Sequence, residues 1–405
     1  MTEPATVRRE VFGTGEDLLL CGNIWEPPAE WEALAGRVQC VYADPPFMTG
    51  DRYYCRRPFG KKGWKTGSPA PQYETYVDRF DGEEDYLRLL RRIIENGREL
   101  LRETGVFFLH LDWHMSARGR LSCDEIFGPD RFLNEIIWAY ESGGRAKRWF
   151  PRKHDTILMY ARSEKYRFDL TRVPIGRKEQ RKNHMARGVD EDGRTYSWIR
   201  SGGKEYRYYD DEPMYPGDVW TDISHLQQRD PERTGFATQK PRKLLERLLL
   251  PVVKEGDWVA DPCCGSGTTL VAAQGLGCRF AGMDPNPAAL TLSMGRLRLE
   301  DLTVVCPTEG SESARLLAEW DAGKRLLRVN GLETSHEAFP EKADPMDALE
   351  AWEAGYIREG VFYSEKAFRR SHAYPDLARE TQMPGDEIPA VLTTDAAGRR
   401  NLFSL

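Results

Sequence analysis

The pattern of hydrophobic positions predicts alternating strands and helices in the first part of the chain. Val38–Tyr42 and Val106–Leu111 are short, nearly continuous apolar runs, which are typical of strands buried on both faces of a sheet. Between them, apolar residues recur at three- and four-residue steps over 84–103, which predicts an amphipathic helix that stops at Gly105. A shorter apolar run spans 18–21, and two more strands are predicted at 134–140 and 156–160.

The same alternation returns after residue 235. Its pattern predicts, in order, a helix over 243–253, a strand over 257–260, a helix over 269–276, a strand over 279–283 and a helix over 287–300. Residues 161–235 differ, because they are polar, basic and aromatic with Gly/Asp turns. We interpret this segment as an inserted module that is mostly β or irregular.

Two further segments show no α/β alternation. Residues 48–80 mix Gly, Pro, aromatic and basic residues without a period, which predicts a long loop, and long loops are usually functional. Residues 301–405 are acidic, with helical patterns at 314–320 and 347–354. The predicted organisation is therefore four parts, at 1–160, 161–235, 236–300 and 301–405.

Charge is distributed unevenly along the 405 residues. The whole chain has 58 basic and 64 acidic residues, a net charge of −6, which excludes a uniformly basic nucleic-acid coat. Residues 143–209, however, hold 18 basic and 8 acidic residues, a net charge of +10, so the remainder carries −16. A basic segment interleaved with aromatic residues is the expected footprint of a phosphate backbone, although a solvated basic face would look the same.

Other classes of protein find little support in the sequence. No apolar run is long enough to span a membrane, and the first ten residues do not resemble a signal peptide, so we expect a cytoplasmic protein. The eight cysteines include no Cys-x-x-Cys pair. His110 and His114 flank Asp112 at a spacing compatible with a metal, but no other ligand cluster accompanies them, and we expect no metal site.

The first segment with candidate chemistry is Asp261-Pro-Cys-Cys-Gly-Ser-Gly-Thr-Thr269, between a predicted strand and a predicted helix. Its glycines permit a positive φ and a close backbone approach, and the helix N-terminus offers free N–H groups to an anion. Asp284 ends the next strand, where an acidic side chain can hold ribose hydroxyls. A structural turn or a dinucleotide site would fit this segment equally well.

The second such segment is Asp44-Pro45-Pro46-Phe47, again at the end of a strand. The Asp44 carboxylate and the Pro45 carbonyl can each accept a hydrogen bond, and Phe47 offers a stacking face. Together these groups fit a planar base with an exocyclic NH₂ group. A rigid turn with a capping Asp is the alternative.

The two motifs together resemble those of the β-class of S-adenosylmethionine-dependent DNA amino-methyltransferases. In that family an Asp/Ser/Asn-Pro-Pro-aromatic motif comes first, a target-recognition domain follows, and an Asp-Pro-Phe-Cys-Gly-Ser-Gly-Thr-Thr motif comes last. Thr238-Gln-Lys-Pro241 and Gly282-Met-Asp-Pro-Asn286 extend the resemblance over roughly residues 15–300. The type III modification-subunit-like branch is the most similar, although Met48 stands where that branch usually has Asn.

The resemblance implies a Rossmann-like, seven-stranded α/β methyltransferase sheet with an inserted target-recognition module and a C-terminal extension. It implies S-adenosyl-L-methionine as cofactor, with Cys263 in place of the usual Phe that packs on it, and Asn23 where many relatives have an acidic residue. The implied cofactor-binding residues are Asp261, Cys263, Gly265, Ser266, Gly267, Thr268, Thr269, Asp284, Asn286, Thr238, Gln239, Lys240 and Asn23.

The resemblance also implies direct methyl transfer to an amino nitrogen of a base flipped out of double-stranded DNA. Asp44, Pro45, Pro46 and Phe47 would form the catalytic site. Asp in the first position of this motif favours adenine N6 in the family. Cytosine N4, an RNA substrate and an inactive DNA-binding accessory subunit are the alternatives.

Two basic clusters are the predicted DNA contacts, and one of them, in the loop after the catalytic turn, is expected to close over the DNA. A homodimer and a cognate restriction endonuclease are further implied partners. The predicted DNA-binding residues are Arg52, Arg56, Lys61, Lys62, Arg145, Lys147, Arg148, Lys153, Arg177, Lys178, Arg181 and Lys182.

Overall fold

A computed structural model describes most of the chain. The described residues are 7–56, 58–66, 72–141, 146–175, 185–227, 229–307, 314–334, 344–371, 373–385, 387–395 and 398–405.

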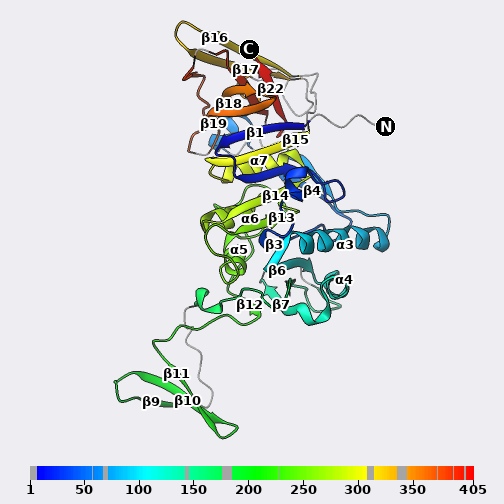
Figure 1. The fold of residues 1–405 in the computed structure, drawn as a ribbon, viewed down its shortest axis with the longest axis vertical. Helices are drawn as coiled ribbons and strands as arrows, with labels where there is room; N and C mark the ends of the chain where they lie inside the picture. Colours follow the sequence, from blue (N-terminus) through cyan, green and yellow to red (C-terminus); the bar gives the residue numbers. More distant parts are fainter. Residues whose placement is uncertain are drawn as a thin grey trace.

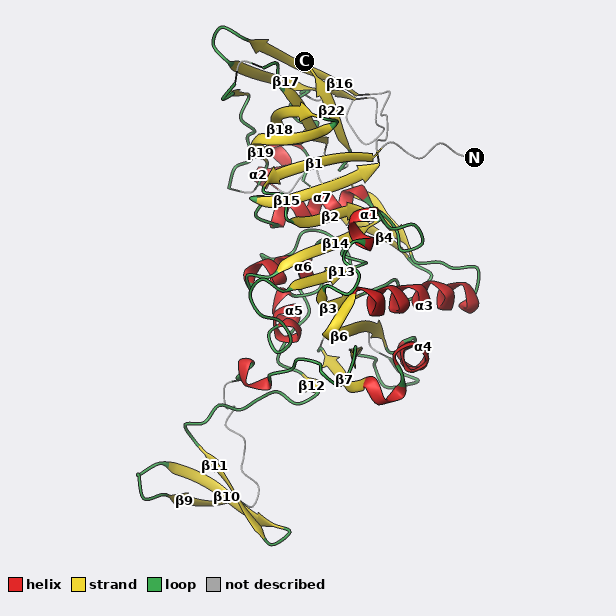
Figure 2. Cartoon of the chain, in the orientation of Figure 1, coloured by secondary structure: helices red, strands yellow, loops and turns green. Residues whose placement is uncertain are grey.

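Seven neighbouring strands form the centre of the molecule, as the resemblance implies (Figures 1 and 2). All are parallel except one, β8, which runs antiparallel to both of its neighbours. Across the sheet their order is β7 (Phe132–Ala139), β8 (His154–Ala161), β6 (Leu101–Asp112), β3 (Val38–Ala43), β13 (Trp258–Asp261), β14 (Arg279–Asp284) and β2 (Asp17–Cys21). The predicted α/β class is confirmed, although Gly105 lies inside β6 and does not end a helix.

Helices cover both faces of this sheet, because its strands are apolar on both sides. One core includes Tyr86 and Leu90 of α3 together with Val41, and the other includes Leu245 of α5 together with Cys40. The helices of the first face are α1 (Ala29–Glu32), α3 (Glu83–Leu100) and α4 (Ser116–Phe127), and those of the second are α5 (Arg242–Leu249), α6 (Thr268–Gly275) and α7 (Pro287–Arg296).

The sheet continues well beyond these seven strands, to fourteen in all. Beyond β2 follow β15 (Asp301–Pro307), β1 (Val7–Gly13), β19 (Val361–Arg369), β18 (Leu349–Arg358), β21 (Ala390–Asp395) and β22 (Arg400–Ser404), and the two-residue β12 (Val219–Trp220) lies at the opposite edge. A separate sheet consists of β16 (Ala314–Asp321), β17 (Leu326–Thr334) and β20 (Glu380–Gln382).

The helices predicted in the C-terminal region are therefore wrong. Residues 314–320 lie in β16, and most of 347–354 lies in β18. β18 is buried along most of its length between β19 and β21, and this pairing overrides the helical pattern of its Ala and Glu residues. The N-terminal strand β1 pairs with both β15 and β19, so the two ends of the chain share one sheet.

A buried ion network joins the two ends of the chain. The Arg400 guanidinium lies 3.2 Å from the Glu353 carboxylate and also contacts Glu10. Arg8 reaches the same Glu10 carboxylate at 2.7 Å. Because these side chains are almost fully buried, each charge needs its partner, and the network fixes how β1, β18 and β22 are placed.

The inserted module contains a small antiparallel sheet, as its turn-rich composition predicts. β9 (Ala186–Val189), β10 (Thr195–Ser201) and β11 (Lys204–Tyr209) form it. Figure 1 shows this sheet standing away from the central sheet, beyond the end that carries β7 and β12.

The long loop predicted over 48–80 is wrong. The segment forms a hairpin of β4 (Arg52–Arg56) and β5 (Gln72–Val77) with a short helix, α2 (Gly60–Thr66), between the strands. The rings of Tyr53 and Tyr76 stack across the hairpin with centroids 4.8 Å apart. Local periodicity could not reveal this hairpin, because it is stabilised by pairing between residues far apart in sequence.

Candidate active site

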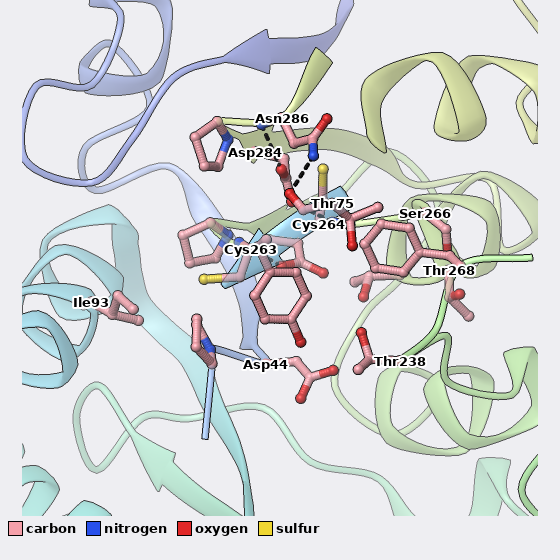
Figure 3. Close-up of a pocket in the computed structure, with 18 of the residues that line it drawn as sticks. Asp44, Thr75, Ile93, Thr238, Cys263, Cys264, Ser266, Thr268, Asp284 and Asn286 are labelled. Carbon is pink, nitrogen blue, oxygen red and sulfur yellow. Dashed lines mark hydrogen bonds between the residues drawn. The ribbon is translucent and has the colours of Figure 1, made fainter. Parts of the chain in front are cut away.

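The two motifs meet at the carboxyl edge of the sheet. β3 and β13 are neighbours there, and the chain continues from β3 toward β6 on one side and from β13 toward β14 on the other. A point where the strand order diverges in this way is the usual ligand site of an open α/β sheet. A cavity of about 250 Å³ lies at this point, and Figure 3 shows it with Asp44 and Thr238 at one end and Asp284 and Asn286 at the other.

Most of the predicted site residues line this one cavity. They include two of the four predicted catalytic residues and all the predicted cofactor-binding residues except Gly267. The lining residues that were predicted are Asp44, Pro46, Asn23, Thr238, Gln239, Lys240, Asp261, Cys263, Gly265, Ser266, Thr268, Thr269, Asp284 and Asn286.

The glycine-rich turn after β13 requires its glycines. Gly265 has φ 49° and Gly267 has φ 74°, both in the left-handed region. A Cβ atom at Gly267 would lie 2.6 Å from Oγ of Ser293, so no larger residue fits without movement. Gly267 thus lies behind the cavity wall and shapes the turn that opens α6.

Two carboxylates, the buried Asp261 and the partly buried Asp284, support the turn. Asp284 accepts hydrogen bonds of 2.9 Å from the backbone N–H groups of Gly265 and Asn286, and Asp261 accepts one of 3.0 Å from that of Cys263. Burial raises the pKa of Asp261 to about 7 and that of Asp284 to about 6. With Asp44, they make the cavity rich in carboxylates, which favours a ligand that carries positive charge.

The adjacent cysteines Cys263 and Cys264 behave as small apolar residues. Cys264 is buried, and Cys263 lines the cavity. Burial raises the pKa of both thiols well above the ordinary value, so neither is a ready nucleophile.

The turn after β3, which contains the predicted catalytic residues, is held by a residue from the end of the hairpin. Asp78, which is almost fully buried, accepts hydrogen bonds from the backbone N–H groups of Phe47, Met48 and Thr49 at 2.8 to 3.2 Å, and from the Thr49 hydroxyl at 2.8 Å. Met48 has φ 60°, a left-handed conformation that is costly for a side chain of this kind. Asp78 therefore stabilises a strained turn through its hydrogen bonds. No sequence motif indicates this role.

Asp44 is itself held by a residue predicted to bind the cofactor. Nζ of Lys240 lies 2.5 Å from Oδ2 of Asp44, with both side chains largely buried, and 5.2 Å from the centre of the Phe47 ring. The second carboxylate oxygen, Oδ1, is buried and has no hydrogen-bond partner among the described residues. Asp44 thus presents one fixed, unsatisfied acceptor at the edge of the cavity.

A buried aromatic and polar network lies under Phe47. The His110 ring stacks on the Phe47 ring with centroids 6.2 Å apart. One His110 nitrogen lies 2.7 Å from the Tyr42 hydroxyl, and the other lies 3.2 Å from the Asp155 carboxylate, which also accepts from Tyr140 at 3.1 Å. Although burial alone would raise it, the hydrogen bond with His110 lowers the pKa of Asp155.

Two other predicted cofactor-binding residues use their side-chain polar groups in hydrogen bonds within the protein. The Gln239 amide bonds to Thr234 and to the Glu232 carbonyl, and the Asn23 side chain accepts from the N–H groups of Trp25 and Glu26. These side chains shape the cavity wall, and their contact with a cofactor stays a prediction.

Sequence reasoning missed one wall of the cavity. It is largely apolar and comes from the hairpin, from α3, from the segment after β2 and from Phe236 in the segment before α5. Its residues are Ile24, Trp25, Thr75, Tyr76, Val77, Leu89, Ile93 and Phe236. Such a wall suits a flat, weakly polar ring.

Several of the predicted DNA-binding residues are ion-paired within the protein. Arg52 bonds to Glu74 at 2.8 Å, and Lys61 lies 2.8 Å from Asp376, so α2 rests against the C-terminal region. Lys153 donates to the Glu141 carbonyl at 2.5 Å. Arg52 and Lys61 are exposed despite these ion pairs, and so are Arg56, Lys62, Lys147 and Arg148. The other five lie outside the described residues: Arg145, Arg177, Lys178, Arg181 and Lys182.

Metal and membrane features are not found in the described part of the chain. No group of three or more His, Cys, Asp or Glu residues there could hold a metal ion. His114 instead bonds to the Asp112 carboxylate at 3.1 Å. Among the described residues, no helix is both long and apolar enough to cross a membrane.

Comparison with known proteins identifies the region that holds both motifs. A family model described as DNA methylase, of the N6/N4 type, matches residues 38–294. The Type II methyltransferase M.EcaI of Enterobacter cloacae is 24% identical over 65% of this chain and 65% of its own length. The DNA adenine methyltransferase YhdJ of Escherichia coli is 24% identical over 65% of this chain and 77% of its own.

Among solved structures, PvuII DNA methyltransferase, described as cytosine-N4-specific, aligns with a TM-score of 0.45 and 14% identity over 71% of this chain and 89% of its own. The chain spans less than two thirds of the length of the first curated relatives that it matches. The resemblance to the type III branch stays a prediction.

Proposed function

The chain belongs to the N6/N4 DNA methylase family, and we propose that it transfers a methyl group from S-adenosyl-L-methionine to N6 of an adenine flipped out of duplex DNA. The main support for the proposal is Oδ1 of Asp44, which is buried and finds no partner in the part of the chain that the structure describes. A buried carboxylate oxygen without a partner is costly, and an amino N–H group would satisfy it.

The cavity supports the cofactor assignment. S-adenosyl-L-methionine carries a net positive charge, and the carboxylates of Asp44, Asp261 and Asp284 line the same cavity. The apolar wall formed by Ile24, Trp25 and Val77 suits an adenine ring.

The residues of the chain would act mainly by positioning. When bound, the cofactor supplies a methyl group on a sulfonium, which is electrophilic. Asp44 Oδ1 and the Pro45 carbonyl would each accept one N–H of the target amino group, which directs the nitrogen lone pair away from the ring. Phe47 would stack on the base, and Lys240 would keep Asp44 in place. Asp44 is also placed to take up the proton that the amino nitrogen releases.

Adenine is proposed because Asp stands first in the catalytic motif, and because the similar protein YhdJ is described as an adenine methyltransferase. The same pair of acceptors would serve the amino group of cytosine, so the base itself has to be measured. Chromosomal or plasmid DNA as substrate would require a cytoplasmic location.

A direct test uses purified protein, isotopically labelled S-adenosyl-L-methionine and plasmid DNA, with digestion to nucleosides and mass spectrometry. We expect labelled N6-methyladenine with the wild type, none with Asp44→Ala, and wild-type amounts with Asp130→Ala, an exposed acidic control. Labelled N4-methylcytosine would show that the target base is cytosine and not adenine. No incorporation into any duplex would favour an accessory DNA-binding role.

Two further proposals concern partners and organisation. We propose a homodimer and a cognate restriction endonuclease, which sedimentation and inspection of neighbouring genes would test. The division at residues 160, 235 and 300 is likewise a proposal, and limited proteolysis would test it.

A further inference from the structure

An exposed aromatic and basic patch lies at the same edge of the sheet as the catalytic turn. We call it the edge patch and define it as Trp113, Lys147, Arg148, Trp149, Phe150 and Arg152. Phe150 is 94% exposed, more than any other large apolar side chain that the structure describes, and Trp149 is 59% exposed. Large apolar groups left in water at one place usually mark a binding surface.

The patch is held in a defined arrangement. The Arg152 guanidinium lies 3.6 Å from the centre of the Trp113 ring and 5.4 Å from that of Trp149. Trp113 follows the end of β6, and Trp149 lies in the segment that leads into β8, so Arg152 holds two separate segments together. Phe150 therefore projects from a segment that the contact between Arg152 and Trp149 holds in place.

The patch is linked to the catalytic turn through the sheet. Asp155, three residues after Arg152, pairs in register with Asp112, the residue before Trp113. The Asp155 carboxylate lies 3.2 Å from the His110 ring, which stacks on Phe47. The edge patch therefore lies beside the position proposed for the flipped base.

The charge of the segment selects a polyanion as its partner. Residues 146–153 contain four basic residues and no acidic one. Another exposed aromatic residue, Tyr374 (74% exposed), lies in the acidic C-terminal region instead. Cations flanking an apolar tip fit a nucleic-acid duplex, whose phosphates they can contact while the ring reaches the stacked bases.

We propose that Phe150 enters the base stack of duplex DNA next to the target base and fills the space that the flipped base vacates. Trp149 and the stack of Arg152 on Trp113 support it, and Lys147 and Arg148 contact the flanking phosphates. This inference rests on the proposed function, because a wedge of this kind is needed only if a base leaves the stack.

The test compares two duplexes that carry the recognition sequence read from modified genomic DNA. In the first the target base is paired, and in the second the position opposite it is abasic, so that flipping needs little help. We expect Phe150→Ala to slow methylation of the paired duplex by roughly tenfold or more, and to slow the abasic duplex much less. Phe150→Leu, which keeps an apolar tip, should restore most of the rate.

The control is Tyr374→Ala, which removes an exposed aromatic side chain far from the patch in sequence, and it should match the wild type on both duplexes. An equal loss on both duplexes with Phe150→Ala, or no loss on either, would overturn the inference. The inference would also be overturned if Phe150→Ala changed the mass measured by sedimentation while its effect on methylation was the same for both duplexes. That result would indicate that Phe150 contacts a second copy of the chain. If the wild type methylates neither duplex, the proposed function itself is wrong. This outcome is distinct from a failure of the role proposed for Phe150.

Discussion

The turn after β13, which we propose binds the cofactor (the cofactor turn), and the turn after β3, which we propose is catalytic (the catalytic turn), face the same cavity, but they are held in different ways. The cofactor turn is fixed by its own glycines and by Asp284, which ends the next strand. The catalytic turn is fixed by Asp78 and Lys240, which come from the hairpin and from the segment before α5. The two turns therefore have separate supports, so that each can be disturbed alone.

The largest effect is expected from Asp44→Ala. This change removes the acceptor at Oδ1, and methyl transfer should fall below detection, a loss of at least roughly 100-fold, since a positioned acid–base group contributes on that scale. Cofactor affinity, measured by calorimetry, should stay within a few-fold, because the turn after β13 is intact. A parallel loss of cofactor affinity would show that the two turns are not independent.

Lys240→Met should have the next largest effect. The long apolar side chain keeps the packing near Phe47 but leaves Asp44 buried without its partner, which costs about 1–3 kcal/mol. We expect a rate loss on the order of tenfold at saturating cofactor, together with a lower melting temperature. Lys243→Met, an exposed neighbour on α5, is the matched control, and an equal loss there would remove the proposed role of Lys240.

Asp78→Asn should loosen the catalytic turn. An amide oxygen can accept fewer and weaker hydrogen bonds than the carboxylate that now binds three backbone N–H groups and a hydroxyl. We expect a loss of about 1–3 kcal/mol in the free energy of unfolding and a lower rate, with rescue by neither salt nor excess cofactor. The exposed residue Asp81 offers the control substitution, Asp81→Asn, and denaturant titration compares the two.

Cofactor binding should depend on pH through Asp261 and Asp284, the carboxylates that support the turn after β13. The pKa of Asp261 is raised to about 7 and that of Asp284 to about 6, so both carry protons in the free protein at acidic pH. A cationic ligand favours the ionised forms, and affinity should therefore fall as the pH decreases from about 7 to 5, by at most tenfold per pH unit for each group. Calorimetry at several pH values should also detect proton release on binding above pH 5; a flat profile would contradict this electrostatic role.

The same two groups affect the stability of the ligand-free protein in the opposite sense. A carboxyl group whose folded pKa lies above its unfolded value contributes less stability as the pH rises from about 4 through 7. Asp261→Asn should therefore stabilise the ligand-free protein more at pH 8 than at pH 5. Thermal unfolding at both pH values measures this, and an equal shift at the two would contradict it.

The smallest effect is expected from Met48→Gly. Met48 has φ 60°, and relief of a left-handed conformation is worth roughly 1 kcal/mol for a residue with a Cβ atom. Greater freedom of Gly in the unfolded chain offsets part of this gain. Met48→Asn, which tolerates the same conformation, should stabilise at least as well, and a destabilised Asn variant would mean that the Met side chain packs usefully against the core.

Both turns could be predicted from the sequence because each motif is local. Strand, turn chemistry and helix start follow one another within about ten residues in Asp261–Thr269, and the two prolines of 44–47 end β3 without ambiguity. The supports of the catalytic turn could not be predicted, because Asp78 lies about thirty residues away and Lys240 about two hundred.

The errors have the same physical origin. Strand pairing overrides the local pattern in each case: β4 and β5 pair across α2, β18 pairs with the distant β21, and β16 pairs with the next strand, β17. For His110, the spacing in the sequence is compatible with a metal ligand, whereas in the fold its ring stacks on Phe47 and bonds to Asp155. Helical periodicity is a reliable guide only where, as in α3, the partner is the sheet next in sequence.

Modification-sensitive long-read sequencing of a genome that expresses this protein tests the central claim most directly, because it gives the base, the position and the recognition sequence together. We expect N6-methyladenine at one recurring sequence in cells with the wild type, and at none in cells with Asp44→Ala. Modified bases that persist with Asp44→Ala, or their complete absence with the wild type, would contradict it.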